Sequence, residues 1–383
     1  MTERAAYVTR TSSILPNAPV TNDEMERILG QVGPRPSRAR RLVLRSNGIH
    51  TRHYAIDPET LQPNFTNASM TAEAVRGLAG PGFDLRQIAC LACGTSIADQ
   101  LIPNHASMVH GELGIPPCEV VATGGACVSG MTAFRYASMA VASGLQPNAV
   151  ATGSELASAT MLAGNFAAEL DARVDALEKN PEIAFEKDFL RWMLSDAAGA
   201  VLLEPQPREA GTSLRVDWID ILSYAGELES CMYAGAVKED SGLLRGWQRF
   251  TSAGREADSV MALKQDVKLL NAKIINYTVE RPLATIMPRH GLRAADIDHF
   301  LGHFSSFFFH DKLHAGMCRA GLDIPVSRWF TNLASRGNTG AASMYVMLDE
   351  LLRSGTLKPG QRILCYVPES GRFSVCWMHL TVV

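Results

Sequence analysis

The stretch Cys127-Val-Ser-Gly130 opens a run of small and apolar residues that closes at Ser143-Gly144 and leads into the apolar segment 149–151. A second stretch, Asn338-Thr-Gly340, opens a comparable run that closes at Ser354-Gly355 and leads into the apolar segment 363–365. Cys127 and Gly144 are separated by the same number of positions as Asn338 and Gly355. Turn-forming residues that bound an apolar run in this way are typical of a turn, a helix and a strand in succession, and the pattern recurs in many α/β proteins. The matched spacing predicts an internal repeat.

The repeat extends upstream of both stretches. The strand-like segment Ile88–Cys93 is followed by a helix-like segment that ends at Gly114-Ile115-Pro116. The strand-like segment Phe300–His303 is followed by one that ends at Asp323-Ile324-Pro325. Short apolar runs that alternate with helical runs indicate an α/β fold with buried strands. We therefore expect an α/β protein made of two duplicated halves.

The predicted halves are an N-terminal domain, 1–205, and a C-terminal domain, 213–383, with a seam near Pro205-Gln206-Pro207. Within the first half, residues 163–193 are too long for a loop and place apolar residues at helical spacing. We interpret this segment as an inserted amphipathic helix. It caps a site, meets a partner subunit or forms a solvated surface helix, and the pattern does not choose among the three.

Composition excludes several functional classes. The chain has 383 residues, is 46% hydrophobic and carries a net charge of −3, which is typical of a globular protein and not of a disordered one. Nearly equal numbers of basic and acidic residues argue against a nucleic-acid partner. We find neither an apolar run long enough to cross a membrane nor an N-terminal signal peptide, so we expect a cytoplasmic protein with no membrane contact. Its eight cysteines are then read as thiols and not as disulfides.

Cys127 is the candidate nucleophile. It follows a Gly124-Gly125 turn and begins a helix of small residues. Backbone N–H groups and the helix dipole at such a position favour a thiolate, which predicts a lowered pKa. The same N–H groups can hold an oxyanion. An inert buried cysteine remains the alternative.

His303 and Asn338 are the candidate partners of Cys127. His303 ends a predicted strand, and Asn338 lies in a Gly337-Asn338-Thr339-Gly340 turn. If the two halves pack about a pseudo-twofold axis, these loops converge on the Cys127 loop. A thiolate with imidazole and amide donors suits thioester acyl transfer, in which the donors stabilise an enolate oxygen.

Two metal sites are weighed against this interpretation. Cys90 and Cys93 have the spacing of a zinc or redox site, but no second such pair exists and apolar neighbours indicate a buried strand. The four histidines at 299, 303, 310 and 314 crowd one segment, and His310 and His314 have a helical ligand spacing without an accompanying carboxylate motif. We predict no metal and no cofactor.

The chain resembles thiolase-fold condensing enzymes of the β-ketoacyl-ACP synthase III type over nearly its whole length. The motifs that carry the resemblance are Gly48-Ile49-His50-Thr51-Arg52, Gly124 to Gly130 around Cys127, Ser195-Asp196-Ala197-Ala198-Gly199-Ala200, His303, and Gly337 to Ser343 around Asn338. The resemblance implies two halves in a layered αβαβα arrangement and a triad of Cys127, His303 and Asn338. It also implies an oxyanion hole from the backbone of Cys127 and Gly371, acyl-ACP or acyl-CoA substrates, and a homodimer.

The chain departs from that family at three places. The family's HQAN motif reads His303-Phe304-Ser305-Ser306, which makes Ser306 a candidate acceptor-site residue, and the glycine-rich C-terminal loop is reduced to Glu369-Ser370-Gly371-Arg372-Phe373. The tryptophan that stacks on coenzyme A in typical members has no equivalent in 25–45. Arginines cluster there instead, and they either dock an acyl carrier protein or form a solvated basic face: Arg35, Arg38, Arg40 and Arg41.

Three N-terminal segments, Leu15-Pro16-Asn17, 22–26 and 44–49, resemble those of the DarB-type ketosynthases of dialkylresorcinol pathways. Such enzymes join two β-ketoacyl thioesters and close a ring. The leading hypothesis is therefore a Claisen condensation through a Cys127 acyl-enzyme, with Glu155 as a candidate second base. Alternatives are synthase III-type initiation with malonyl-ACP, an oxygen or nitrogen acyltransferase of the same fold, a non-catalytic subunit of a condensing heterodimer, and a metallohydrolase built on the histidines.

Overall fold

The computed structural model describes residues 5–32, 38–166 and 190–383. The predicted insertion at 163–193 lies almost wholly outside the described residues, apart from a short 3-10 turn, η2 (Ala163–Phe166), and residues 190–193. Within the described ranges, no helix is long and apolar enough to cross a bilayer.

Ten strands form one mixed sheet that consists of two halves with the same internal order. The N-terminal half follows the order β5-β4-β6-β7-β1, and the C-terminal half the order β14-β13-β15-β16-β8. When the five strands of each half are numbered in chain order, both halves have the same spatial order, 3-2-4-5-1. The N-terminal strands are β1 (Tyr7–Ile14), β4 (Cys90–Thr95), β5 (Glu119–Gly124), β6 (Ala149–Glu155) and β7 (Ala197–Glu204). The C-terminal strands are β8 (Leu214–Ser223), β13 (His299–Gly302), β14 (Trp329–Phe330), β15 (Arg362–Glu369) and β16 (Ser374–Val382).

The two halves join through a short antiparallel pairing of β1 with β8, in which Tyr7 faces Arg215 and Val8 faces Leu214. The pairing pattern is also the same in each half. The strands β4 and β13 each form two parallel pairs, and the strands between them and the junction pair antiparallel. The repeat found in the sequence is therefore a repeat of topology.

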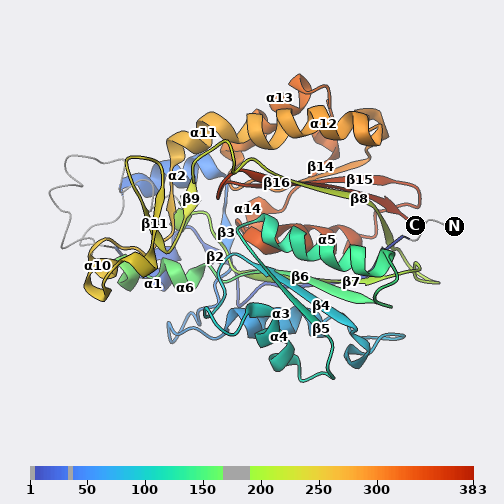
Figure 1. The fold of residues 1–383 in the computed structure, drawn as a ribbon, viewed down its shortest axis with the longest axis horizontal. Helices are drawn as coiled ribbons and strands as arrows, with labels where there is room; N and C mark the ends of the chain where they lie inside the picture. The colour runs from blue at the N-terminus through green and yellow to red at the C-terminus, as the bar shows by residue number, and fades with distance from the viewer. Residues whose placement is uncertain (1–4, 33–37, 167–189) are drawn as a thin grey trace.

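Helices cover both sheet halves and fill the space between them (Figure 1). One outer layer contains α3 (Asn67–Arg76) and α4 (His105–Leu113). The opposite outer layer contains α11 (Val267–Ile275), α12 (Arg281–His290) and α13 (His310–Arg319). The central layer contains α5 (Val128–Ala142), α14 (Leu333–Arg336) and α15 (Ser343–Arg353). This is the predicted αβαβα arrangement.

Shorter elements lie mainly at one end of the layers. They are β2 (Val20–Thr21), α1 (Met25–Leu29), α2 (Arg38–Asn47), β3 (Thr51–Arg52), α6 (Ser158–Met161), β9 (Met232–Tyr233), β10 (Ala236–Lys238), β11 (Leu244–Gly246), α10 (Ser252–Ala257), β12 (Lys264–Gln265) and a π-helical turn, η4 (Asn276–Glu280). Short 3-10 turns include η6 (Phe307–Phe309) and η8 (Gly340–Ala342).

The central layer is packed so closely that side chains are excluded at several backbone positions. A Cβ added to Gly130 would lie 2.3 Å from the carbonyl oxygen of Ala341, and one added to Gly153 would lie 2.2 Å from the same oxygen. The buried ring of Tyr345 fills the remaining space, and its hydroxyl donates a hydrogen bond of 2.7 Å to the carbonyl of Gly130. Glycine is required here because only hydrogen fits between the backbones.

The topology brings the candidate residues together. Cys127 follows the carboxyl end of β5, Glu155 ends β6, His303 follows β13 and Glu369 ends β15. The pairs β4–β5 and β4–β6 in one half and β13–β15 in the other are parallel, so the carboxyl ends within each half lie at the same edge. Cys127, Glu155, His303 and Glu369 from these two edges line one common cavity. Ligands in such sheets bind outside the carboxyl ends of the strands.

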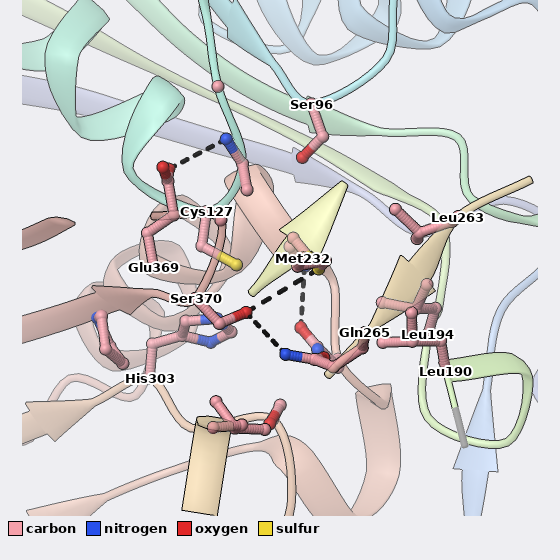
Figure 2. A pocket seen from close by; sticks show the side chains of 18 of the residues that line it. Ser96, Cys127, Leu190, Leu194, Met232, Leu263, Gln265, His303, Glu369 and Ser370 are labelled. Atoms are coloured by element: carbon pink, nitrogen blue, oxygen red, sulfur yellow. Dashed lines mark hydrogen bonds between the residues drawn. The ribbon is translucent and has the colours of Figure 1, made fainter. Parts of the chain in front are cut away.

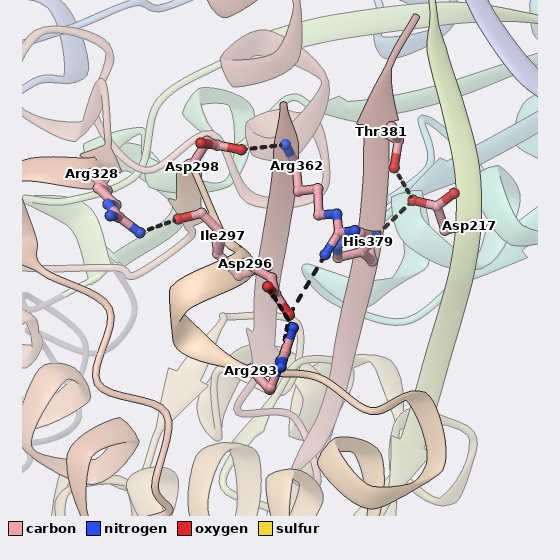
Figure 3. A network of polar contacts seen from close by, with 9 residues as sticks. All are labelled: Asp217, Arg293, Asp296, Ile297, Asp298, Arg328, Arg362, His379 and Thr381. Carbon is pink, nitrogen blue, oxygen red and sulfur yellow. Dashed lines mark hydrogen bonds and ion pairs between the residues drawn. The ribbon is translucent and has the colours of Figure 1, made fainter. Parts of the chain in front are cut away.

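A polar network fixes the opposite end of β15 (Figure 3). The backbone N–H of Arg362 donates to Asp298 at 2.8 Å, and its guanidinium lies 3.6 Å from Asp296. On the neighbouring strands Asp217 accepts from Thr381 at 2.6 Å and pairs with His379 at 2.7 Å. These residues anchor strand ends and lie away from the candidate site.

We expect Gly153→Ala to lower the free energy of unfolding by about 1–3 kcal/mol, because the new methyl group would collide with the Ala341 carbonyl and the Tyr345 ring. Urea denaturation measures this change. Gly111 in α4 is the matched control, since a Cβ there meets no atom within 4 Å. Gly111→Ala should be neutral or stabilising by up to about 1 kcal/mol. Equal stability of the two variants would contradict the proposed crowding.

Candidate active site

A cavity of about 450 Å³ lies where the carboxyl ends of the strands meet. Cys127, Glu155, His303, Asn338 and Gly371, all singled out in the sequence, line it. In Figure 2 Cys127, His303 and Glu369 lie on one side of the pocket and Leu190, Leu194 and Leu263 on the other. The structure therefore joins a polar end and an apolar end in one site.

Cys127 is half-buried and forms the N-cap of α5. The expectation of a lowered pKa is wrong for this structure. Burial raises the pKa of the Cys127 thiol well above its usual range, and the carboxylates of Glu369 and Glu155 raise it further. The helix terminus does not offset these effects, so the thiol is neutral in the absence of substrate.

Glu369 explains why the helix terminus gives so little support to a thiolate. Its Oε2 accepts hydrogen bonds from the N–H groups of Ala126 at 2.9 Å and Val128 at 3.1 Å. Figure 2 shows the Glu369 carboxylate close to Cys127, with one of these bonds as a dashed line. The carboxylate thus occupies the anion-binding position on both sides of the nucleophile. Burial raises the pKa of Glu369, while the two N–H donors act in the opposite direction.

His303 is buried, and its backbone N–H donates to the carbonyl of Tyr366 at 2.8 Å, which fixes the loop after β13 against β15. Burial lowers the pKa of His303 to about 4. The imidazole is therefore neutral near pH 7. A neutral imidazole keeps one N–H donor for a substrate oxygen without placing a positive charge in the cavity.

Asn338 is held by backbone bonds to the other half of the molecule. Its N–H donates to Met193 at 2.9 Å, and its carbonyl accepts from Ser195 at 2.9 Å. The side-chain Oδ1 accepts from the N–H of Gly340 at 3.0 Å. Because the amide oxygen is engaged, the amide nitrogen is the group available to donate to a substrate.

Glu155 is buried at the end of β6 and also faces the cavity. Its Oε2 accepts from Ser96 Oγ at 2.6 Å and from the Ala341 N–H at 3.3 Å. Burial raises its pKa to about 7, although these hydrogen bonds oppose the shift. A carboxyl group with a pKa near neutrality is suited to proton transfer.

The apolar end of the cavity is built by segments that no motif marks. α11 contributes Leu270, Ile274 and Ile275, and α13 contributes Leu313. The strand β9 contributes Met232, whose sulfur lies 3.8 Å from Ser370 Oγ, and Ser370 accepts from Gln265 at 3.0 Å. The wall opposite Cys127 is therefore apolar, which suits an apolar ligand more than a charged one.

The structure does not support one sequence-based assignment. Ser306 does not line the cavity, whereas its neighbour Ser305 does. Ser306 is fully buried and its hydroxyl accepts from the Phe308 N–H at 3.2 Å, so it caps the turn η6. The local need to cap this turn directs the Ser306 side chain away from the cavity.

The arginine cluster is only partly described. Arg35 and the side chain of Arg38 lie outside the described residues. Arg40 is paired within the protein: it lies 2.8 Å from Glu26 and 3.7 Å from Asp23. Arg41 is exposed. Carrier-protein docking by these residues stays a prediction.

Cys90 and Cys93 lie in a buried strand, as their apolar neighbours in the sequence indicate. The strand is β4, in which every residue is buried, and burial raises the pKa of each cysteine to about 12. Of the histidines, His310 pairs with Asp311 at 2.8 Å and His299 contacts Gln361 at 3.3 Å. His303 alone of the four lines the cavity.

We expect Glu369→Gln to lower the pH at which Cys127 becomes reactive by about one unit or more, because an amide oxygen keeps the two N–H bonds while the negative charge is removed. The measurement is the rate of Cys127 alkylation by iodoacetamide against pH, followed by mass spectrometry. Glu73→Gln is the control, since Glu73 is exposed on α3. An unchanged profile in Glu369→Gln would show that the carboxylate does not oppose thiolate formation.

Comparison with known proteins identifies relatives of the whole chain. A family model described as 3-oxoacyl-[acyl-carrier-protein] synthase III C terminal matches residues 287–371. A β-ketoacyl-[acyl-carrier-protein] synthase III of Xanthomonas oryzae pv. oryzae is 25% identical over 358 residues, which cover 92% of this chain and 91% of that protein.

Two solved structures show the same fold. AbyA1, a tetronic acid condensing enzyme, superposes with a TM-score of 0.74 at 19% identity and covers 98% of this chain and 99% of its own. OleA of Xanthomonas campestris, solved with lauric acid and lauroyl-CoA, superposes with a TM-score of 0.74 at 18% identity and covers 99% of both chains. The predicted thiolase fold is confirmed.

Proposed function

We propose that this chain is a condensing enzyme of the β-ketoacyl synthase III type and that it joins two acyl thioesters through an acyl-enzyme on Cys127. The observation that carries the proposal is the convergence of Cys127, His303 and Asn338 on one cavity with an apolar wall. A thiol nucleophile with two uncharged donors is the set that thioester condensation requires.

In the first half-reaction the sulfur of Cys127 attacks the carbonyl carbon of an acyl thioester. The bond to the departing thiol breaks, and that thiol leaves with the cysteine proton. The N–H groups of Ala126 and Val128 are held by Glu369, so the N–H of Cys127 and that of Gly371 are the proposed oxyanion donors. The acyl chain then lies along the wall formed by α11 and α13.

In the second half-reaction a new thioester binds with its carbonyl oxygen between His303 and Asn338. These donors stabilise the enolate that forms when the α-carbon loses carbon dioxide or a proton. The α-carbon attacks the acyl carbon on Cys127, a carbon–carbon bond forms and the bond from that carbon to the cysteine sulfur breaks. The thiolate takes up a proton from the base that deprotonated the acceptor or, after decarboxylation, from solvent. The product is a β-keto thioester. This sequence consumes only acyl thioesters.

The acceptor distinguishes two versions of the proposal. Decarboxylation of a malonyl thioester needs no base, whereas removal of a proton from a β-ketoacyl thioester does. Glu155 faces the cavity with a pKa of about 7, which supports the second version. In that version two β-ketoacyl units are joined and the product cyclises to a dialkylcyclohexanedione or resorcinol precursor.

For the acyl carriers, we propose acyl-ACP or acyl-CoA as the source of both units and a homodimer as the working form. The relative solved with lauroyl-CoA supports a coenzyme A donor. The exposed Arg41 supports contact with an acidic carrier protein, because rim charges attract such partners through long-range electrostatics.

Transfer of the acyl group to an oxygen or nitrogen nucleophile is the second candidate. It would use the same acyl-enzyme but would not need two donors at an enolate oxygen. The presence of both His303 and Asn338 in the cavity therefore favours condensation.

We expect Cys127→Ala to take up no acyl group from acyl thioesters, whereas His303→Ala and Asn338→Ala should become acylated but lose about 10²–10³-fold in condensation rate. Intact-mass analysis measures acylation, and product assays measure condensation. His310→Ala is the control for His303→Ala, because His310 contacts Asp311 outside the cavity. Acylation of Cys127→Ala would place the nucleophile elsewhere.

We expect Glu155→Gln to slow turnover of a β-ketoacyl acceptor by about 10²–10⁴-fold and to leave turnover of a malonyl acceptor nearly unchanged. The carboxylate form exists above the pKa of about 7, so the wild-type rate with the β-ketoacyl acceptor should rise with pH through that value. The variant should lack this rise. Efficient conversion of malonyl thioester alone to a linear product would reject ring formation and keep the condensing function.

A further inference from the structure

A second group of chemically reactive side chains lies at the C-terminal end of α13. His314 and Cys318 stand one helical turn apart, and Asp323 follows in the turn after the helix. His314 Nε2 lies 3.3 Å from Asp323 Oδ1 and 3.7 Å from Cys318 Sγ, and Cys318 Sγ lies 3.4 Å from Asp323 Oδ1. Among the described residues this is the one group of three such donors within mutual reach of a metal ion.

The three separations match the edges of a coordination tetrahedron. Zinc binds sulfur at about 2.3 Å and nitrogen or oxygen at about 2.0–2.2 Å with tetrahedral angles, so two ligands on one ion lie roughly 3.3–3.6 Å apart. The three observed edges are 3.3, 3.4 and 3.7 Å. An ion can therefore enter without a large movement of any ligand.

The backbone that carries these ligands is anchored by its neighbours. Met317, next to Cys318, is fully buried, as are Leu322 and Ile324 on either side of Asp323. Trp329 Nε1 donates to the carbonyl of Ile324 at 3.0 Å, and the Trp329 ring meets the His314 ring edge-on at 5.7 Å. Such support reduces the ordering cost of binding.

The donor set selects the kind of ion. One thiolate, one imidazole and one carboxylate suit a borderline ion such as Zn²⁺ and are poor ligands for Mg²⁺ or Ca²⁺, which prefer oxygen. The spacing noted for His310 and His314 is not used, because His310 pairs with Asp311 instead. His314 finds its helical partner in Cys318.

We propose that His314, Cys318 and Asp323 form a surface site for Zn²⁺ or a similar transition-metal ion, with solvent as the fourth ligand. On binding, the thiol of Cys318 releases its proton and sulfur coordinates the ion. The site fastens the end of α13 to the following turn. The inner face of the same helix carries Leu313 of the cavity wall, but none of the three ligands lines the cavity.

The test uses the full chain and Co²⁺ as a spectroscopic probe for the Zn²⁺ site. We expect one equivalent of Co²⁺ to give a thiolate-to-cobalt charge-transfer band in the near ultraviolet, which Zn²⁺ displaces and Mg²⁺ does not. Cys318→Ser should abolish the band. Asp323→Asn and His314→Gln should weaken binding at least about tenfold, because loss of even an outer-shell partner costs about 10–100-fold in metal affinity.

Two controls separate this site from the catalytic cavity. Cys127→Ala should keep the band. If the ion were bound to the Cys127 thiolate instead, this variant would lose the band. Cys118→Ser, at a half-buried cysteine outside the cluster, should also keep it. Condensation by Cys318→Ser should equal wild type within about twofold. The proposal is overturned if the band is absent from the wild type, persists in Cys318→Ser or disappears in Cys127→Ala.

Discussion

The structure depends on the close backbone contact between the start of α5 and the turn Gly340–Ala342, which lie in different halves of the chain. This contact exists because Gly130 and Gly153 present no side chain toward the Ala341 carbonyl. It sets the separation between the nucleophile loop and the Asn338 loop. Any side chain at these glycines would part the two loops, and the cavity would lose the convergence on which its chemistry depends.

The second constraint is desolvation, which acts on every titratable group at the polar end of the cavity. Burial keeps the His303 imidazole neutral, keeps the Cys127 thiol protonated and moves the pKa of Glu155 to about 7. The pKa of the histidine falls and those of the cysteine and the glutamate rise, and each of these shifts disfavours the charged form of the group. The cavity thus holds the Cys127 thiol and the His303 imidazole uncharged near pH 7, whereas Glu155 is partly ionised there. The neutral imidazole is an advantage, because it can donate to an enolate oxygen without attracting a counter-ion.

Much of the fold could be predicted from the sequence because the duplication repeats turns and apolar runs at equal spacing. The same spacing located Cys127, His303 and Asn338, since equivalent loops of two related halves meet at one centre. Glu369 was missed as a functional residue. Its role depends on a bond from the end of β15 to N–H groups of the other half, and no local pattern records such a contact.

The remaining errors have related causes. The lowered pKa expected for Cys127 followed from the helix terminus alone, whereas burial and two carboxylates from distant segments dominate. Ser306 was assigned by its place in a motif, whereas the turn η6 uses its hydroxyl. The cavity wall at α11 and β9 arises from long-range packing of ordinary apolar residues, which carry no signature of the site they form.

The two loops that depart from the family pattern, at Ser306 and at Glu369, bear on different steps of the proposed reaction. With Ser306 engaged in its turn, the cavity keeps His303 and Asn338 as side-chain donors, and Ser305 takes the place beside them in the lining. With Glu369 bound to the N–H groups of Ala126 and Val128, the donor side keeps fewer backbone donors for an oxyanion. In the proposed reaction this arrangement leaves the first tetrahedral intermediate to the N–H groups of Cys127 and Gly371 and the enolate to His303 and Asn338. Glu369 therefore bears on the acylation step, and the two side-chain donors bear on the condensation step.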